Sequence, residues 1–172
     1  MENEYLIHYG VKGMKWGVRK ERPIPETRTV KTKYGETLTL RRDEGGRLAK
    51  ALRRVSKTIR EEADKTYNYD VLSGDKKVGT FQMYQKSNGE MNVTWGDTEK
   101  AYRGRGYMQA CMSAGEKIAK ELGNVKITGE LVGNSPDIFT AANHRGWVKV
   151  GEDRSKAVMD TWGGLTLVEK KL

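Results

Sequence analysis

The chain has 172 residues, 36% of them hydrophobic, and a net charge of +9. This composition is too apolar for a wholly disordered protein, and the length fits one domain or a domain with an arm. No apolar run approaches the roughly 20 residues of a membrane-spanning helix, and the N-terminal MENEYLIHYG lacks the features of a signal peptide. One cysteine and two histidines exclude a disulfide framework and predict no metal site. We therefore expect an intracellular protein without a membrane partner.

The positive charge is confined to the first third of the chain. Residues 1–60 hold 16 lysines and arginines against 7 acids, whereas residues 61–172 hold 16 of each. A basic arm ahead of a neutral domain indicates an anionic partner, such as nucleic acid or an acidic protein surface, or an arm that only aids solubility.

The N-terminal peptide YLIHYGVKGMKWGVRK, residues 5–20, combines aromatic rings, glycines and cations. Such a peptide can stack its rings on a partner while its cations meet negative charge, or it can be a terminus without a role. It resembles the H-[YH]-G-[VI]-K-G-[MQ]-K-W-G-V-R-[RK] peptide found near the ends of tailed-bacteriophage proteins, often ones encoded among head and scaffold genes. The resemblance implies a phage origin, a tag for a capsid or scaffold protein, and a location in the host cytoplasm or packaged in the virion.

The segment after this peptide predicts a linker, a hairpin and a helix. Pro23 and Pro25 indicate an extended linker, and TRTVKTKYGETLTLRRD alternates as a hairpin does. Residues 46–63 predict one amphipathic helix, because the aliphatic residues recur at a spacing of three to four: Leu48, Leu52, Val55 and Ile59. Such a helix can lie on DNA or on a membrane, but we favour docking by its apolar side.

From Tyr67 onward the pattern changes to strands. The segments YNYDVL, VGTFQMYQK and MNVTW are separated by turns that contain Ser-Gly and Asn-Gly, which are typical of hairpins. There follow a helix from about Tyr107 to Leu122, the strand VKITGELV, a short helix in SPDIFTAANHRG, the strand WVKVGED, and a last strand pair in AVMDTWGGLTLVEK. This order predicts one α/β (α+β) domain with a mixed, mostly antiparallel sheet flanked by helices.

A glycine-rich turn, YRGRGY at residues 102–107, joins the strand MNVTW to the predicted helix. It leaves backbone N–H groups free at a helix N-terminus, where the helix dipole and two arginines add positive potential suited to a pyrophosphate. The turn is not a Walker loop, because no Gly-Lys-Ser/Thr follows it, and it is not a dinucleotide fingerprint, because the third glycine is missing at its spacing. A purely structural turn, or an arginine–glycine contact to nucleic acid, is the alternative.

The segment EKAYRGRGYMQACMSAGEKIAKELG resembles the acyl-CoA-binding motif of the GNAT superfamily of N-acetyltransferases, R/Q-x-x-G-x-G/A. Arg103 fills its first position and Gly106 its fourth, but Met108 stands where the family has Gly or Ala. Downstream, GNSPDIFTAANHRGW resembles the family's N…A…Y…G-F/W segment. Ala142 there replaces the tyrosine that usually protonates the leaving thiolate.

The GNAT resemblance implies that acetyl-CoA is the co-substrate and assigns roles to residues. The strand edge from Val93 to Trp95, together with Asn134, would bind the pantetheine arm. The pyrophosphate would lie on the backbone amides of the turn: Arg103, Gly104, Arg105, Gly106, Tyr107 and Met108. Asp97 and Glu130 are candidate bases and His144 a candidate acid, although each can equally be a solvated surface residue. Cys111 is predicted to lie in the core.

The sequence thus predicts a phage-encoded GNAT-fold N-acyltransferase that moves an acetyl group from acetyl-CoA to an amine of a protein or small molecule. Residues 1–22 would form the tag, 23–66 the linker, hairpin and helix, and 67–172 the acyl-CoA-binding domain. The alternative is a non-catalytic virion- or capsid-associated binding protein with a degenerate GNAT fold, which Met108 and Ala142 favour. A nucleic-acid-binding protein that uses the first 60 residues is a third reading, which we do not favour.

Overall fold

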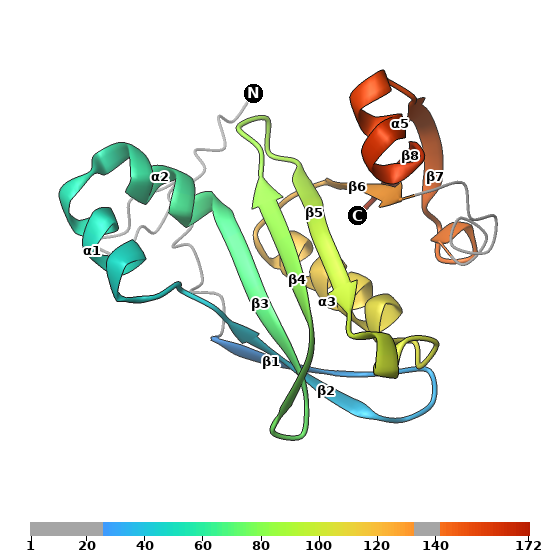
Figure 1. Cartoon of the computed structure of the whole chain (residues 1–172), viewed down its shortest axis with the longest axis horizontal. Helices are drawn as coiled ribbons and strands as arrows, with labels where there is room; N and C mark the ends of the chain where they lie inside the picture. Colours follow the sequence, from blue (N-terminus) through green and yellow to red (C-terminus); the bar gives the residue numbers. More distant parts are fainter. Residues whose placement is uncertain (1–25, 133–141) are drawn as a thin grey trace, which may run out of the picture.

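The computed structural model describes residues 26–132 and 142–172, and these form one eight-stranded sheet with helices around it (Figure 1). The strands lie in the order β1-β2-β3-β4-β5-β6-β8-β7. All neighbouring strands are antiparallel except β5 and β6, which are parallel. The predicted mixed, mostly antiparallel sheet is therefore confirmed.

The elements follow one another along the chain with these bounds: β1 Thr27–Lys31, β2 Thr37–Arg42, α1 Arg47–Val55, α2 Lys57–Lys65, β3 Thr66–Ser73, β4 Lys76–Gln85, β5 Met91–Thr98, the 3-10 turn η1 Lys100–Tyr102, α3 Tyr107–Glu121, β6 Lys126–Val132, β7 Val148–Asp153, α5 Lys156–Trp162 and β8 Leu165–Lys171.

The predicted N-terminal hairpin is present as β1 and β2, and it belongs to the same sheet as the later strands. Gly35 makes the turn with a φ of 87°, a conformation that favours glycine. β2 pairs with β3 from Leu38↔Ser73 to Arg42↔Tyr69. The hairpin thereby extends the sheet toward the N-terminal end of α3, which matters for the site described below.

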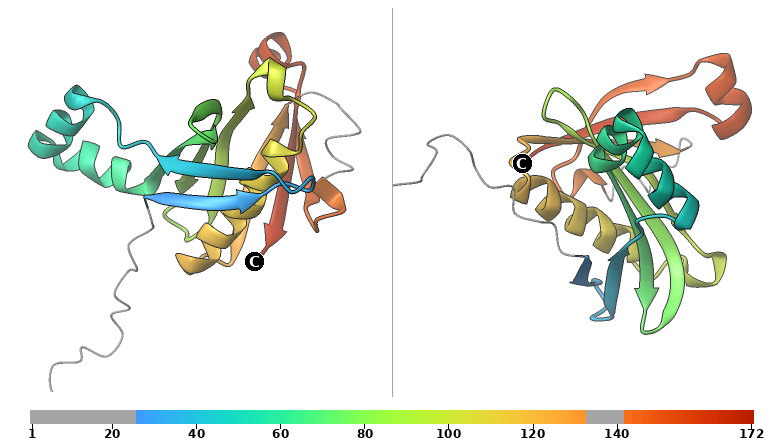
Figure 2. Two further views of the ribbon diagram at one scale, coloured as in Figure 1. Left: turned by 90° about the horizontal axis from the view of Figure 1, so that it is seen from below. Right: turned by 90° about the vertical axis from the view of Figure 1, so that its left-hand side faces the viewer.

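Helix α3 packs on one face of the sheet (Figure 2). Its Gly115 lies so close to β4 that a Cβ there would come within 2.9 Å of Met83 Sδ and 3.0 Å of Phe81 Cζ. Strands β3 and β4 bury alternate side chains, as a sheet with one covered face requires. The buried cluster includes Leu38, Leu40, Tyr67, Tyr69, Val71, Phe81, Met83, Val93, Tyr107, Cys111, Ile118, Ile127, Trp147 and Val168.

The single docked helix predicted for residues 46–63 is wrong in two respects. Ser56 adopts an extended conformation and divides the segment into α1 and α2; its Oγ accepts the Ile59 N–H at 3.3 Å and so caps α2. The aliphatic stripe also faces solvent, with Leu48 75% and Val55 82% exposed. Figure 1 shows both helices standing away from the sheet at its β3 side. The periodicity of the segment predicted an apolar stripe, but it does not specify a surface on which that stripe can pack.

The predicted final strand pair is also wrong in its first half, because residues 156–162 form helix α5. Ser155 precedes the helix, and Gly163 ends it in the left-handed conformation with a φ of 69°. These start and stop signals outweigh the strand-like alternation. Only β8 is a strand there, and it lies between β6 and β7.

Within the described segments, the helices are too short and too polar to cross a membrane. Residues 26–132 and 142–172 also bring together no group of three potential metal-binding side chains.

Candidate functional site

Strands β5 and β6 start as a parallel pair and then separate. Their pairing runs from Met91↔Ile127 to Val93↔Gly129 and stops there, although β5 continues to Thr98 and β6 to Val132. Just beyond the last pair, Thr94 is an extra residue in the β4–β5 ladder, since Met83 pairs with Val93 and Gln82 with Trp95. The bulge increases local twist. Backbone groups of β5 past Val93 therefore have no β6 partner and face the gap.

The turn that follows β5 presents a run of free backbone donors. Gly104 and Gly106 have φ values of 81° and 75°, and Gly106 is the N-terminal cap of α3. The first helical N–H with a backbone acceptor is that of Ala110, which donates to Gly106 O at 3.1 Å. Within the described residues, the N–H groups from Gly104 to Gln109 donate to no backbone or side-chain acceptor. This run fits the phosphate oxygens of a nucleotide-like group.

Cationic side chains surround this turn. Arg105 and Lys76 lie over the Tyr102 ring, with the guanidinium carbon 5.2 Å and the ammonium 5.0 Å from its centroid. Lys33 from the β1–β2 turn passes close to Gly106, where an added Cβ would lie 3.4 Å from its Cγ. These cations reinforce the positive end of the α3 dipole.

Arg103 instead turns back toward β5. Its Nε donates to Thr98 O at 3.0 Å, and its Nη2 lies 3.4 Å from Asp97 Oδ1. It fixes the end of β5 to the turn rather than adding a free charge. Asp97, one of the candidate bases, is thereby half of an exposed ion pair.

Met108 occupies the motif position that the family fills with Gly or Ala, and its side chain points at the sheet. A Cβ on Gly96 of β5 would come within 2.6 Å of Met108 Sδ. The thioether thus packs over a glycine on the core side of β5. Met108 departs from the motif in sequence, but its side chain does not occupy the outer side of the turn.

A hydrogen-bonded anchor fixes the start of α3 to the N-terminal hairpin. Tyr107 is 2% exposed, and its hydroxyl donates to Glu36 Oε1 at 2.5 Å. Ser73 Oγ donates to the same oxygen at 2.7 Å. The hydrogen bonds from Tyr107 and Ser73 hold the pKa of Glu36 below its ordinary value. Strands β1–β2 and the β3–β4 turn therefore position the glycine turn.

Of the other predicted catalytic residues, Glu130 is the one at the strand separation. It follows Gly129, the last β6 residue paired with β5, and it is exposed. His144 is exposed near the end of the short segment that follows residue 141. Asn134, the predicted pantetheine contact, lies outside the described residues.

The chain after that segment docks on α3. Arg145 Nη1 donates to Gln109 O at 2.8 Å, and the buried Trp147 donates from Nε1 to Glu116 Oε1 at 2.9 Å. Ala142 is half-buried and packs against the core. A larger side chain at Ala142 would therefore meet the core.

Several solved structures have a fold similar to that of this chain. An IAA acetyltransferase from Bacillus cereus has a TM-score of 0.60 at 12% identity, covering 78% of this chain and 99% of its own. A Bacillus subtilis acetyltransferase in complex with CoA has 0.60 at 13%, covering 83% and 99%. A GNAT family acetyltransferase from Elizabethkingia anophelis with acetyl-CoA bound has 0.61 at 12%, covering 78% and 98%. The chain has the GNAT fold. At these identities the likeness extends to the fold alone.

Sequence comparisons add one match at the N-terminus. Residues 1–23 match the model of a family of unknown function (DUF7211). The search of curated proteins gave no match.

Sequence reasoning missed several residues around the GNAT-fold site. Glu36 and Lys33 lie about 70 residues before the turn in the chain, and only the hairpin's place in the sheet brings them to α3. One signal in the sequence could have revealed the polar residues of this sheet. In YNYDVL and VGTFQMYQ they alternate with buried residues, which places them on the sheet face opposite α3.

Proposed function

We propose that this protein is an N-acyltransferase that takes the acetyl group of acetyl-CoA and transfers it to an amine. The observation that carries the proposal is the run of free N–H groups from Gly104 to Gln109 at the end of a strand that parts from its parallel neighbour. The turn suits the pyrophosphate, and the free edge of β5 from Val93 to Trp95 suits the amide groups of the pantetheine arm.

In the proposed reaction, the neutral amine nitrogen attacks the thioester carbonyl carbon. A C–N bond forms, the C–S bond breaks, the nitrogen loses a proton and the coenzyme A thiolate gains one. In this proposal Glu130 accepts the amine proton, directly or through water; its position directly after the last β5–β6 pair supports that assignment. Because position 142 is alanine, water supplies the proton to the coenzyme A thiolate. A free thiol has a pKa of roughly 8.5, so its thiolate can leave with the help of water alone.

A second candidate is a binding protein that retains the fold without catalysis. Ala142 in place of an acid favours it, since positioned acid catalysis is commonly worth about 10²–10⁴-fold. The two candidates differ in turnover and not in fold.

Calorimetry with coenzyme A, followed by thiol release from acetyl-CoA with a panel of amines, separates these candidates. The proposal expects saturable binding and amine-dependent thiol release. Binding without release on any amine supports the binding protein, and absence of binding rejects both acyl-CoA readings.

The proposed phage origin and head association rest on the resemblance of residues 5–20 to a phage peptide. Deleting residues 1–22 is expected to leave the sheet folded, because the fully buried apolar residues of the described segments begin at Leu38. The truncated protein is expected to lose co-purification with phage heads during infection. Equal incorporation of full-length and truncated protein would reject the tag.

A further inference from the structure

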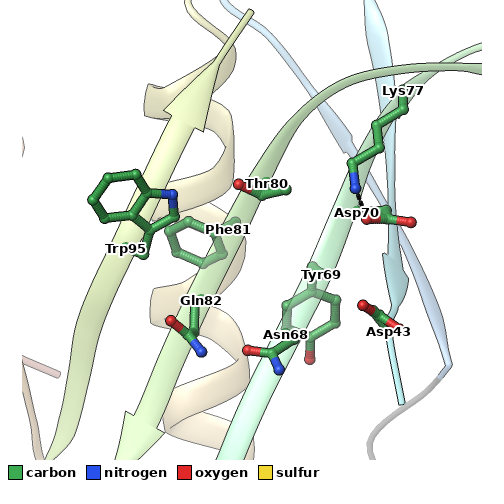
Figure 3. Close-up of a pocket in the computed structure, with 9 residues that line it drawn as sticks. All are labelled: Asp43, Asn68, Tyr69, Asp70, Lys77, Thr80, Phe81, Gln82 and Trp95. Atoms are coloured by element: carbon green, nitrogen blue, oxygen red, sulfur yellow. Dashed lines mark ion pairs between the residues drawn. The ribbon is translucent and has the colours of Figure 1, made fainter. Parts of the chain in front are cut away.

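The sheet face opposite α3 carries a row of polar side chains that crosses the strands and ends beside the β5–β6 separation. Asn68 on β3 pairs with Gln82 on β4, and Gln82 pairs with Trp95 on β5. Directly paired residues point to the same face of a sheet. Asp43, the residue after the end of β2, extends the row on the other side of Asn68, because its backbone N–H donates to Asn68 O at 2.8 Å. Figure 3 shows the four side chains in this order.

These residues line one pocket of about 210 Å³ together with Asp70, Lys77 and Thr80. Asp70 is already neutralised, since its carboxylate lies 2.5 Å from Lys77 Nζ and 3.4 Å from Arg41 Nη2. Asp43 has no cationic partner within the described residues; its Oδ1 accepts only the Gly45 N–H at 2.8 Å. Asp43 is therefore the carboxylate of the pocket that has no ion pair among the described residues.

The remaining polar groups of the row also lack partners. The Asn68 Oδ1 atom is buried and accepts no hydrogen bond in the part of the chain that the structure describes. The Gln82 amide makes no hydrogen bond to any described side chain or backbone group. A buried, unpaired carbonyl is costly unless a ligand or water satisfies it. The Asp43 carboxylate and the two carboxamide oxygens can all accept hydrogen bonds, which suits a ligand with several N–H donors.

The far end of the row has an aromatic wall. Trp95 is 44% exposed, and its ring meets that of Trp162 from α5 edge to face at a centroid distance of 5.9 Å. Trp162 is 41% exposed. An indole face beside the row suits the alkyl segments and cationic nitrogens of a ligand.

We propose that this row, Asp43, Asn68, Gln82 and Trp95, is the acceptor site and that it takes a linear polyamine. This inference rests on the proposed acyl transfer. Neighbouring strands are roughly 4.8 Å apart, which is close to the separation of two nitrogens joined by a three-carbon segment of an extended polyamine. Such a ligand lies across the strands, with its distal ammonium at Asp43 and its reacting nitrogen past Trp95 at the gap. Charge repulsion between its nitrogens lowers their pKa values, which helps the reacting amine to be neutral.

The first test measures spermine binding by calorimetry in 0.15 M NaCl without coenzyme A. The net charge of +9 repels polycations in general, so binding there reports a local site. We expect Asp43→Asn to weaken binding at least tenfold. Asp64→Asn removes the same charge from an exposed position on α2 and is expected to leave binding unchanged. Gln82→Ala provides a second variant in the row, with a smaller expected loss.

The side-chain amide resonances of Asn68 and Gln82 give an independent readout by NMR, and they are expected to shift on addition of spermine. No binding of spermine, or equal binding by the Asp43→Asn and Asp64→Asn proteins, would overturn the inference. Equal shifts with butylamine, which has no distal ammonium, would also overturn it.

Turnover separates this inference from the proposed function. With active enzyme, Asp43→Asn is expected to raise the KM for spermine more than the KM for butylamine, whereas Asp64→Asn is expected to leave both KM values unchanged. Turnover that does not discriminate between the two amines overturns the polyamine site and leaves the acyltransferase standing. Spermine binding at the row without any thiol release supports polyamine binding there and rejects both the acyltransferase and the role of the row as its acceptor site.

Discussion

Met108 lies directly over Gly96, so that a Cβ at Gly96 would come within 2.6 Å of its sulfur and 2.7 Å of its methyl carbon. This pair explains how the glycine turn tolerates a long side chain at a position where the GNAT motif has a small one. The side chain enters a space that β5 leaves open by having no side chain there.

The Gly96–Met108 pair predicts a coupled effect on stability. Gly96→Ala should lower the free energy of unfolding by about 1 kcal/mol, because overpacking is relieved only by moving the flexible thioether. Met108→Ala should cost about 1–2 kcal/mol through lost packing. In the double variant the Gly96→Ala penalty should disappear, which urea unfolding of all four proteins measures. Additive losses would contradict the contact. Coenzyme A affinity should change less than twofold in Met108→Ala.

Gly106→Val should reduce coenzyme A affinity at least tenfold, which corresponds to about 1.4 kcal/mol or more. Gly106 has a φ of 75° and an added Cβ would meet Lys33, so the substitution disturbs the turn as well as blocking its backbone. Gly89→Val is the matched control: its φ is 80°, and it lies in an open turn away from the site. If both variants fold and bind coenzyme A as the parent does, the turn is not the phosphate site.

The anchor between Tyr107 and Glu36 predicts a pH-dependent stability difference. The hydrogen bond lowers the pKa of Glu36 below 4.5, so its stabilising effect is complete above that pH and is lost as the pH falls through the lowered pKa. Tyr107→Phe should therefore be less stable than the parent at pH 6.5, with a gap that narrows by pH 3. Urea unfolding at both pH values checks this. If the difference in stability between the parent and Tyr107→Phe is the same at both pH values, ionisation of Glu36 does not contribute to that difference.

Glu130→Gln should lower kcat with acetyl-CoA by about 10²-fold or more while coenzyme A affinity stays the same, if Glu130 takes the amine proton. His144→Ala is the comparison variant and should change the rate little. A large fall in kcat for His144→Ala alone, at unchanged affinity, would assign the proton transfer to His144 instead.

Cys111 should resist thiol reagents in the folded protein. It is 1% exposed, and burial raises the pKa of its thiol to about 12, so little thiolate forms at pH 8. Labelling with a chromogenic disulfide should be slow in buffer and rapid in guanidinium chloride. Fast labelling of the native protein would show that α3 separates readily from the sheet.

Much of the fold followed from local patterns in the sequence. The turns at Gly35 and Gly89, the alternation of YNYDVL and VGTFQMYQK, and the apolar side of the helix from Tyr107 each act over a few residues. The glycine turn before that helix was predictable for the same reason, because free N–H groups at a helix start depend only on the adjacent backbone.

Only the tertiary structure decided which distant residues meet. Sequence periodicity specifies an apolar stripe but not its partner, and so it gave no sign that Leu48 and Val55 face solvent. Sheet register placed Glu36 against Tyr107, Met108 over Gly96 and the row from Asp43 to Trp95 on one face. These contacts depend on which strands pair, and pairing is decided by the burial of the whole sheet face against α3, which no short segment encodes.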